Sequence, residues 1–436
     1  MITKIIGKLR FYFAIFLLRL AVTINNAALA ASVMAWVAWR AVPESPLPAG
    51  RTWPRVLCIG RTIFVDDVKA MAKYSGQIEY VVVHLQYFDQ IFRHFFTQET
   101  RGLVGENNYH LSPPDLEGKV RYAEFLRRLL PHLRLKFGIQ AVLSGNFNYS
   151  IQQELCRVSE YWGIPFIVLH KEGMDIFRDS IASLYGTQRF TGRKALFYNE
   201  RIRKDFLQIK LPGLTEDNSV AVGIPRLDSY FVRRYEPPQK KQITLFTIDP
   251  SSYFTYLMND KQKFAAIGER TGEYYRVVME FALRHPEFRV VIKTKAAKHY
   301  ADQVNAIREK HFPNQPMPNL VITNSASPSV LIRDSQAIIS YNSTTLIEAM
   351  LTGRPVITLD FRDLIPGPQW DYFGNHQELA NYVRTLPDLE NLLLHPEKPA
   401  RPGEAEKAAF LRELIYIPDG RASQRAEAAI LQTIKR

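Results

Sequence analysis

Short apolar segments rich in Val and Ile alternate with longer amphipathic segments along most of the chain. This alternation predicts parallel β-sheets that are covered by helices on both faces. A first series of predicted strands comprises Val56–Gly60, Tyr80–Leu85, Ala141–Gly145, Phe166–His170, Ala195–Tyr198 and Val220–Gly223. A second series comprises Ile243–Ile248, Arg289–Lys293, Leu320–Thr323, Ala337–Ser340 and Val356–Leu359. We therefore predict an α/β protein with two Rossmann-like, doubly wound domains.

Two polar segments that contain prolines separate the predicted parts of the chain. Pro43–Gly50 is typical of a linker, and Arg233–Gln242 lies between the two series of strands. The amphipathic segment from Gly403 onward is expected to be helical and either to cap the second domain or to return to the first. We predict a leader with linker at 1–50, an N-terminal domain at 51–235, a C-terminal domain at 240–402 and a helical tail at 403–436.

The leader contains an uncharged run of 20 residues, Leu20–Trp39, which is long enough to cross a bilayer as one helix. Four arrangements remain open: a single span, a secretory signal, a buried core helix, and an anchor that lies in the membrane plane or re-enters it. The in-plane arrangement is suggested by residues that would share one side of a continuous helix: Lys4, Lys8, Arg19, Asn26 and Arg40. We predict an apolar, membrane-associating helix.

The charge balance agrees with a membrane-bound leader. The chain has 56 Lys and Arg against 43 Asp and Glu, a formal charge of +13. Residues 1–61 contain eight basic side chains and one acidic one, Glu44, so more than half of the surplus lies at the N-terminus. Such a surplus favours anionic lipid over nucleic acid as a partner. The two cysteines, Cys58 and Cys156, provide neither a disulfide scaffold nor metal-ligand spacing.

The segment Ala337–Asp360 has the pattern strand, turn, helix, strand. At the predicted helix start it places four polar residues with amide or hydroxyl side chains, Asn342, Ser343, Thr344 and Thr345. A helix N-terminus at the carboxyl end of a parallel strand binds phosphate well, and Glu348, one turn on, could accept hydrogen bonds from ribose. The alternative is an ordinary helix cap with a solvated Glu348.

Two blocks of residues resemble a known superfamily. Ser343–Ala349 followed by Gly353–Val356 resembles the donor-binding stretch of GT-B glycosyltransferases. Val222–Asp228 resembles the G-x-P-R-x-D stretch of bacterial capsule and surface-polysaccharide transferases and of the related glycerophosphotransferases of teichoic acid synthesis. The resemblance covers about Arg193–Asp360. It implies that residues 342–345 bind the nucleotide phosphates and that Glu348 binds ribose.

Further candidates lie at the ends of predicted strands. Lys293 or Lys295 could neutralise a leaving phosphate, and the Asp249–Ser252 turn is a weak donor-site candidate. In the N-terminal domain the strand ending at His170 runs into Glu172 and Asp175. We favour Glu172 as the catalytic base that removes the acceptor proton, with His170 and Asp175 as substitutes or orienting groups. A plain polar turn is the alternative for this segment.

These features predict a membrane-associated, metal-independent glycosyltransferase. It would transfer a sugar from a nucleotide-sugar donor to a surface-polysaccharide or lipid-linked glycan acceptor. We expect no cofactor beyond the nucleotide-sugar co-substrate, no metal site and no nucleic-acid partner. The expected location is the cytoplasmic face of the inner membrane, in a peripheral or monotopic arrangement. The alternatives are a CDP-glycerol-type glycerophosphotransferase, a nucleotide-sugar epimerase and a non-catalytic polysaccharide-assembly protein.

Overall fold

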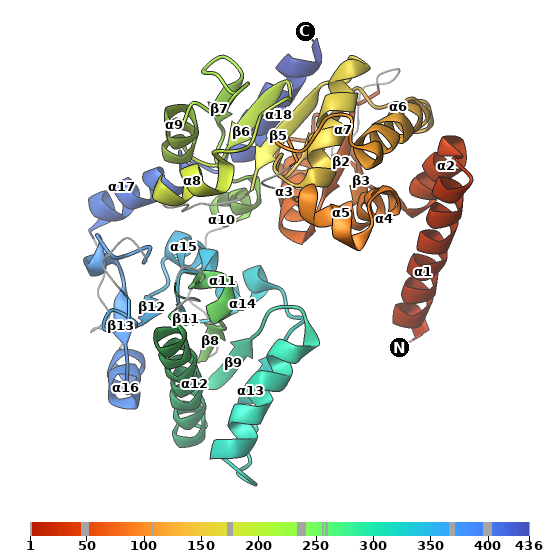
Figure 1. The fold of residues 1–436 in the computed structure, drawn as a ribbon. Coiled ribbons are helices and arrows are strands. Elements are labelled where there is room, and N and C mark those ends of the chain that lie inside the picture. The colour runs from red at the N-terminus through yellow and green to blue at the C-terminus, as the bar shows by residue number, and fades with distance from the viewer. Residues whose placement is uncertain are drawn as a thin grey trace. The chain divides into compact units, whose positions relative to one another are not determined.

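The computed structural model divides the chain into two compact units (Figure 1). Unit 1 comprises Met1–Ser229 together with Arg412–Arg436, and unit 2 comprises Tyr230–Leu411. The structure describes residues 2–44, 52–105, 109–171, 178–232, 241–254, 257, 260–365, 371–395 and 403–435. Within these residues each unit contains one extended sheet, so the prediction of two Rossmann-like α/β parts is confirmed.

The sheet of unit 1 has seven strands in the order β1-β3-β2-β4-β5-β6-β7. All neighbours are parallel except β1, which runs antiparallel to β3. Six of the strands correspond to the first predicted series, and β1 was not predicted. The bounds are β1 Trp39–Ala41, β2 Arg55–Gly60, β3 Glu79–His84, β4 Ala141–Ser144, β5 Phe166–His170, β6 Lys194–Phe197 and β7 Ser219–Ala221. Strands β4 and β5 are buried along their whole length, as expected for parallel strands covered on both faces.

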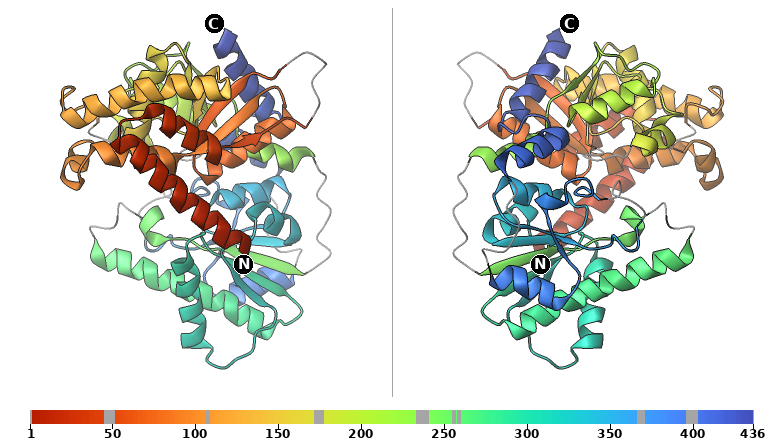
Figure 2. Two further views of the ribbon diagram at one scale, coloured as in Figure 1. Left: turned by 90° about the vertical axis from the view of Figure 1, so that its right-hand side faces the viewer. Right: turned by 90° about the vertical axis from the view of Figure 1, so that its left-hand side faces the viewer.

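Helices connect these strands and cover the sheet of unit 1 (Figure 2). Their bounds are α3 Thr62–Tyr74, α4 Leu85–Phe95, α5 Gln98–Leu103, α6 Glu117–Phe137, α7 Ser150–Tyr161, α8 Arg178–Tyr185, α9 Glu200–Gln208, the 3-10 helix η1 Pro225–Asp228 and α18 Ala422–Lys435. Helix α10, Ser229–Val232, spans the boundary between the units.

The leader forms two helices instead of the single apolar helix predicted for it. Helix α1 is Ile2–Thr23 and helix α2 is Ala27–Val37. Asn25 between them has a φ of 56°, a left-handed conformation that ends α1. The side chain of Asn26 then caps α2 by accepting a hydrogen bond of 2.9 Å from the N–H of Leu29. Among the described helices, none combines the length and the apolar character needed to cross a bilayer. A single helix over Leu20–Trp39, one of the arrangements left open by the sequence, does not form, because α1 ends at Thr23 and α2 begins at Ala27.

The predicted basic stripe is also wrong, for the same reason. Asn26 belongs to the cap of the second helix and Arg40 lies in β1, so neither continues the surface of α1. One face of the hairpin packs inward: α1 contacts α2 and α4, and α2 contacts α6. Leu18 and Met34 are fully buried in the same core cluster as Phe88 and Phe125. Part of the leader is thus a structural component of unit 1.

The C-terminal tail returns to unit 1, one of the two outcomes left open by the sequence. Helix α18 packs against α3. The buried carboxylate of Asp228 accepts hydrogen bonds from the N–H groups of Ala422, at 3.0 Å, and Ser423, at 2.7 Å, and so caps α18. Glu427, also buried, accepts a hydrogen bond of 2.7 Å from the hydroxyl of Tyr80.

The G-x-P-R-x-D stretch has a structural explanation in this fold. Asp228 holds the C-terminal helix, and Arg226 forms an ion pair of 3.1 Å with the buried Asp67 on α3. Gly223 has a φ of 88°, and a Cβ added there would lie 3.0 Å from the side chain of Ala422. A glycine thus allows the close approach of the tail to this stretch.

The sheet of unit 2 has six parallel strands in the order β10-β9-β8-β11-β12-β13. The bounds are β8 Gln242–Phe246, β9 Arg289–Lys293, β10 Leu320–Thr323, β11 Ala337–Ser340, β12 Val356–Leu359 and β13 Asn381–Val383. The second predicted series is confirmed, and β13 was not predicted. The helices are α11 Pro250–Tyr253, α12 Lys261–Arg284, α13 Lys298–His311, α14 Pro328–Asp334, α15 Thr344–Leu351, η4 Gln377–Leu379, α16 Leu386–Leu394 and α17 Glu404–Ile415, of which α17 extends past the boundary at Leu411.

Candidate functional site

The strand order of unit 2 creates a place for a ligand at the carboxyl ends of two central strands. Strand β8 lies between β9 and β11, and the chain leads from it to β9 and β10 on one side and later to β11, β12 and β13 on the other. At such a switch point the loops that follow the two central strands diverge, and ligands of open α/β sheets bind in the crevice between them. The loops in question begin at Thr247, after β8, and at Tyr341, after β11.

The turn after β11 has the geometry predicted for it. Ser343 is the N-cap of α15, and its hydroxyl accepts hydrogen bonds from the N–H of Thr345, at 3.3 Å, and from the hydroxyl of Thr345, at 2.8 Å. Asn342 has a φ of 43°, and its side-chain oxygen accepts a hydrogen bond of 2.8 Å from the N–H of Tyr372. Asn342, Ser343 and Thr344 are half-buried. The turn therefore presents the N-terminus of an eight-residue helix at the switch point.

Glu348 is not a solvated residue. Its side chain is 9% exposed, and one carboxylate oxygen accepts a hydrogen bond of 2.5 Å from the hydroxyl of Tyr230. Tyr230 is itself buried and belongs to the same unit. The pair fixes the carboxylate one turn into α15, and its contact with ribose stays a prediction. Tyr230 was missed because nothing local in the sequence connects positions 230 and 348.

The two candidate lysines occupy different places. Lys293, at the end of β9, donates hydrogen bonds to the carbonyl oxygens of Thr294, at 2.5 Å, and of Asn324, at 3.3 Å; Asn324 follows β10. Burial lowers the pKa of Lys293. Lys295 lies 3.2 Å from the carboxylate of Asp249, which follows β8. Of the two lysines, Lys295 is therefore the one beside the switch point.

Asp249 organises the loop after β8. Its carboxylate accepts hydrogen bonds of 2.9 Å from the hydroxyl of Tyr300 and of 3.1 Å from the N–H of Ser251. The predicted turn at this place is thus confirmed, with Asp249 as the N-cap of α11. Tyr300 was not singled out in the sequence.

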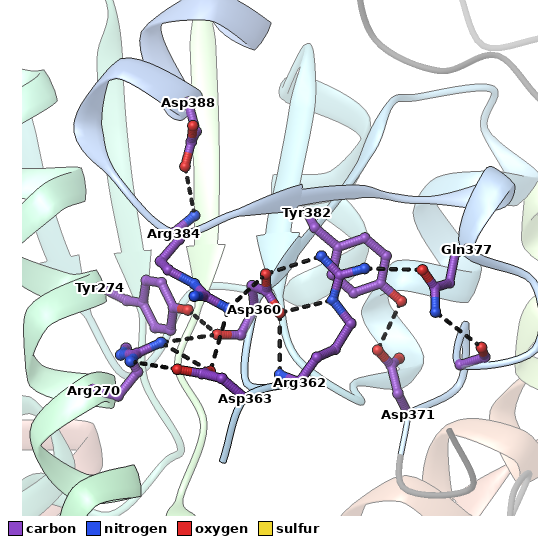
Figure 3. Close-up of polar contacts among 11 residues, drawn as sticks. Arg270, Tyr274, Asp360, Arg362, Asp363, Asp371, Gln377, Tyr382, Arg384 and Asp388 are labelled. Atoms are coloured by element: carbon purple, nitrogen blue, oxygen red, sulfur yellow. Dashed lines mark hydrogen bonds and ion pairs between the residues drawn. The ribbon is translucent and has the colours of Figure 1, made fainter. Parts of the chain in front are cut away.

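Three arginines and two aspartates form a charged network where β12 and β13 end, with Arg270 contributed by α12 (Figure 3). Asp360 accepts hydrogen bonds of 2.9 Å from Arg362 and 3.1 Å from Arg384, while Arg270 pairs with Asp363 at 3.0 Å. Burial alone would raise the pKa of Asp360. The hydrogen bonds and positive charges of Arg362 and Arg384 outweigh burial and hold that pKa below its ordinary value.

Asp371 and Tyr382, which lie beside this network, support the turn at Asn342. Asp371 accepts hydrogen bonds of 2.8 Å from the hydroxyl of Tyr382 and 2.9 Å from the N–H of Phe373, as Figure 3 shows for Tyr382. Burial raises the pKa of Asp371. The next residue, Tyr372, donates its N–H to Asn342. The side chains after β12 and β13 thus fix the segment that holds the beginning of α15.

In unit 1 the structure favours a structural role for His170. The side chain is 1% exposed and is enclosed by the rings of Phe147, Tyr185, Phe197 and Phe206. Its Nε2 atom lies 3.3 Å from the hydroxyl of Tyr185. The other two predicted residues of this loop, Glu172 and Asp175, lie outside the described residues. Their role in proton transfer stays a prediction.

In the part of the chain that the structure describes, we find neither a group of side chains that could hold a metal ion nor an exposed cysteine thiol. There, no three His, Cys, Asp or Glu side chains are grouped so that they could hold a metal ion. Cys58 and Cys156 are both buried as free thiols, and burial raises the pKa of each.

Comparisons with known proteins extend the result on the fold. No protein-family model matches the chain, and no curated protein matches it in sequence. A solved structure of a putative UDP-N-acetylglucosamine 2-epimerase from Listeria monocytogenes superposes with a TM-score of 0.54 at 12% identity, over 88% of this chain and 97% of that one. The chain has a GT-B fold. At this identity the likeness concerns the fold alone.

Two further GT-B structures are similar over most of their length. One is the UDP-GlcNAc 2-epimerase from Neisseria meningitidis bound to UDP-GlcNAc, with a TM-score of 0.49, 13% identity, and coverage of 87% of this chain and 100% of that one. The other is an α,α-trehalose 6-phosphate synthase from Burkholderia multivorans, with a TM-score of 0.45, 11% identity, and coverage of 88% and 98%.

Proposed function

We propose that this chain is a glycosyltransferase that transfers a sugar from a nucleotide-sugar donor to a surface-polysaccharide or lipid-linked glycan acceptor at a membrane surface. The observation that carries the proposal is the arrangement at the switch point of unit 2. There the N-terminus of α15 and the Lys295–Asp249 pair follow neighbouring strands of one sheet, β11, β8 and β9.

The donor would bind through its phosphates. The first N–H groups of α15 and the positive end of the helix dipole are suited to a phosphate, and Lys295 adds a full positive charge. Glu348, held by Tyr230, would accept hydrogen bonds from ribose hydroxyls. The N-terminus of α15 and the ammonium group of Lys295 would stabilise negative charge on the departing nucleotide, so the proposed reaction needs no metal ion.

The chemical step joins an acceptor hydroxyl to the anomeric carbon of the sugar. The oxygen of the acceptor forms the new bond while the bond from the anomeric carbon to the phosphate oxygen breaks. The hydroxyl proton passes to a base, for which we propose Glu172, and the electron pair of the broken bond leaves with the nucleotide. The enclosed position of His170 counts against it as the base.

We further propose that unit 1 attaches the enzyme to the membrane. The exposed apolar side chains of α1 and the basic surplus of residues 1–61 support this attachment. A nucleotide-sugar donor is made in the cytosol, and so we place the enzyme on the cytoplasmic face of the inner membrane as a peripheral or monotopic protein.

A thermal-shift screen tests the donor site. The purified chain is heated with UDP, GDP, CDP or CMP, and one nucleotide should raise the melting temperature. The variant Ser343→Ala/Thr344→Ala should lose most of that shift. Thr97→Ala, which removes a threonine N-cap on α5 of unit 1, serves as the control because it loses a similar cap without touching this turn. Equal shifts in all three proteins would refute the donor site.

Product analysis then tests the reaction. Incubation with the stabilising nucleotide's sugar derivative should transfer the sugar to a glycan acceptor, and Glu172→Gln should abolish the transfer while the nucleotide-induced shift persists. Conversion of UDP-GlcNAc to its 2-epimer without transfer would identify an epimerase instead. Transfer of glycerol phosphate from CDP-glycerol would identify a glycerophosphotransferase. Nucleotide binding without any turnover would favour a non-catalytic assembly protein.

A further inference from the structure

The outward face of α1 carries a stripe of apolar side chains. Six large side chains of this stripe are exposed to solvent, five on α1 and one directly after it: Leu9, Tyr12, Phe13, Phe16, Leu20 and Ile24. At 100° per residue they fall within about 120° of the helix circumference. Phe13 and Phe16 are 54% and 60% exposed. A contiguous exposed patch of this kind marks a surface that contacts a partner or a membrane.

The opposite face of the same helix is already used. Ala14, Leu18 and Ala21 are fully buried in the core of unit 1. Helix α1 is therefore apolar on two sides, and core packing accounts for only one of them. Figure 2 shows α1 and α2 side by side at the surface of unit 1, with α6 next to α2.

Arginines flank the stripe on both sides. On the helical wheel Arg10 lies beyond one edge and Arg19 beyond the other, and both are exposed. Arg10 lies over the ring of Trp36, with 5.0 Å between guanidinium carbon and ring centroid, and Arg19 donates a hydrogen bond of 2.6 Å to Gln90. These contacts hold the two charges at the margins of the apolar surface. An interfacial helix on anionic lipid has this distribution of apolar and basic side chains.

The stripe ends at a basic cavity. Ile24, its last residue, lines a cavity of about 500 Å³ between the α1–α2 turn and the C-terminal half of α6. Two arginines of α6, Arg127 and Arg128, and His132 contribute to the lining, together with Trp162. Among the described residues that line it there is no carboxylate.

The cavity is held open by specific contacts. Arg128 donates a hydrogen bond to the side-chain oxygen of Asn25 in the turn. The indole N–H of Trp162 donates a hydrogen bond of 2.9 Å to the carbonyl oxygen of Arg127, which fixes the ring at the rim. Ala27 and Ala28, the first residues of α2, also line the cavity, and so the positive end of that helix adds to the arginine charges.

We infer that the stripe of α1 lies in the headgroup layer of an anionic membrane and that this cavity binds the phosphate of an anionic phospholipid. The inference deepens the membrane attachment of the proposed function. The two arginines complement the charge of a phosphate, and the apolar stripe leads directly into their cavity, as the acyl chains of a phospholipid lead to its phosphate. Aromatic rings such as that of Trp162 are favoured at the level of lipid headgroups.

Vesicle co-sedimentation of the full chain tests the inference. The wild-type protein should bind phosphatidylcholine vesicles that contain phosphatidylglycerol and bind pure phosphatidylcholine far more weakly. Arg127→Gln/Arg128→Gln should weaken binding to the anionic vesicles about 30-fold, because each basic residue near such a surface contributes about a factor of five. Arg284→Gln/Arg333→Gln, which removes two exposed arginines of unit 2, is the charge-matched control and should bind as the wild type does.

A second pair of variants tests the stripe. Phe13→Ser/Phe16→Ser should weaken binding to anionic vesicles by about 100-fold or more, since two aromatic side chains no longer leave water. Leu283→Ser/Val330→Ser changes two exposed apolar residues of unit 2 and should have no effect. Binding that is the same in the stripe variant and in its control would overturn the inference.

Two further measurements separate the possible failures. The first is a thermal shift with inorganic phosphate. If phosphate stabilises the wild type but not Arg127→Gln/Arg128→Gln, and the wild type does not bind vesicles, the cavity binds free phosphate and the lipid assignment is overturned. The nucleotide-induced shift is measured in the same variants. If variants that no longer bind vesicles still show the nucleotide-induced shift, the inference is supported. If no protein shows that shift, the donor site is refuted, and the vesicle experiments alone then test whether α1 and the cavity bind a membrane.

Discussion

The hydroxyl of Tyr230 donates a hydrogen bond to Glu348 over 2.5 Å, although 118 residues separate the two along the chain. Both side chains are buried, and together they fix a carboxylate one turn into the helix that begins at the switch point. The position of the Glu348 carboxylate therefore depends on Tyr230, the first residue of unit 2.

Removal of this hydroxyl should affect stability and binding together. We expect Tyr230→Phe to lower the free energy of unfolding by about 1–3 kcal/mol, because a buried carboxylate loses a donor. It should also weaken binding of the stabilising nucleotide severalfold. Urea unfolding and titration calorimetry measure the two effects. In a double-mutant cycle Glu348→Gln should add little to Tyr230→Phe, and full additivity would show that the pair is not coupled.

Lys293 and Lys295, at and after the carboxyl end of β9, should differ in their contribution to nucleotide binding. Lys295→Ala should weaken it about tenfold or more, since a charge-assisted contact to phosphate is lost. Lys293→Ala should leave the affinity within about twofold, because its ammonium group is turned toward the end of β10. Titration calorimetry compares the two variants. A larger loss in Lys293→Ala would reverse our assignment.

The charged network after β12 predicts a loss of stability in acid. Because the pKa of Asp360 is lower in the folded protein than its ordinary value of 3.8, its contribution is fully present above that value and is lost as the pH falls through the folded pKa. Asp360→Asn should therefore lower the free energy of unfolding by about 1–3 kcal/mol at neutral pH. The difference from the wild type should shrink toward pH 2, as urea unfolding over a pH series would show.

The control for this pH series is Asp302→Asn, which changes an exposed aspartate on α13. Its stability should follow that of the wild type at every pH. A constant gap between Asp360→Asn and the wild type down to the lowest pH would mean that Asp360 contributes through packing and not through its charge.

The break in the leader predicts a specific cap effect. Asn26→Ala removes the side-chain acceptor at the start of α2 and should cost about 0.5–2 kcal/mol. Asn26→Ser keeps an oxygen at the cap and should retain most of that stability. Chemical unfolding of the full chain compares them. If the segment formed one continuous helix, Asn26→Ala would stabilise the protein, since alanine favours a helix interior.

Asp228 offers a fifth test. Asp228→Ala leaves the N–H groups of Ala422 and Ser423 without this acceptor and should cost about 1–3 kcal/mol. The tail should also become more sensitive to limited proteolysis. Asp217→Ala, an exposed aspartate in the same unit, should change neither property. A protected tail in Asp228→Ala would exclude this capping role.

The strands were predictable because parallel strands covered on both faces need continuous apolar residues, a local property that the sequence displays. The start of α15 was predictable for a similar reason, since Ser343 is a cap residue placed directly after such a strand. Strand β13 escaped notice because Asn381–Val383 is only three residues long and contains an asparagine.

Other features depend on contacts between distant residues and were not predictable. Lys293 and Lys295 look alike in sequence, and only the order β10-β9-β8 shows that one lies toward Asn324 and the other beside Asp249. The leader has the composition of a membrane helix. It is nevertheless divided at Asn25, because that residue adopts a left-handed conformation and because one face of each of the two helices packs into the core of unit 1.

The return of the C-terminal tail to unit 1 has a consequence for the order of folding. Because Asp228 binds Ala422 and Ser423 and Tyr80 binds Glu427, unit 1 cannot complete its contacts until α18 has been synthesised. Unit 2 is continuous from Tyr230 to Leu411 and is synthesised before that point. The N-terminal segment of unit 1 is therefore made before unit 2 but completes its packing after it, and its α18-binding surface stays uncovered while unit 2 is translated.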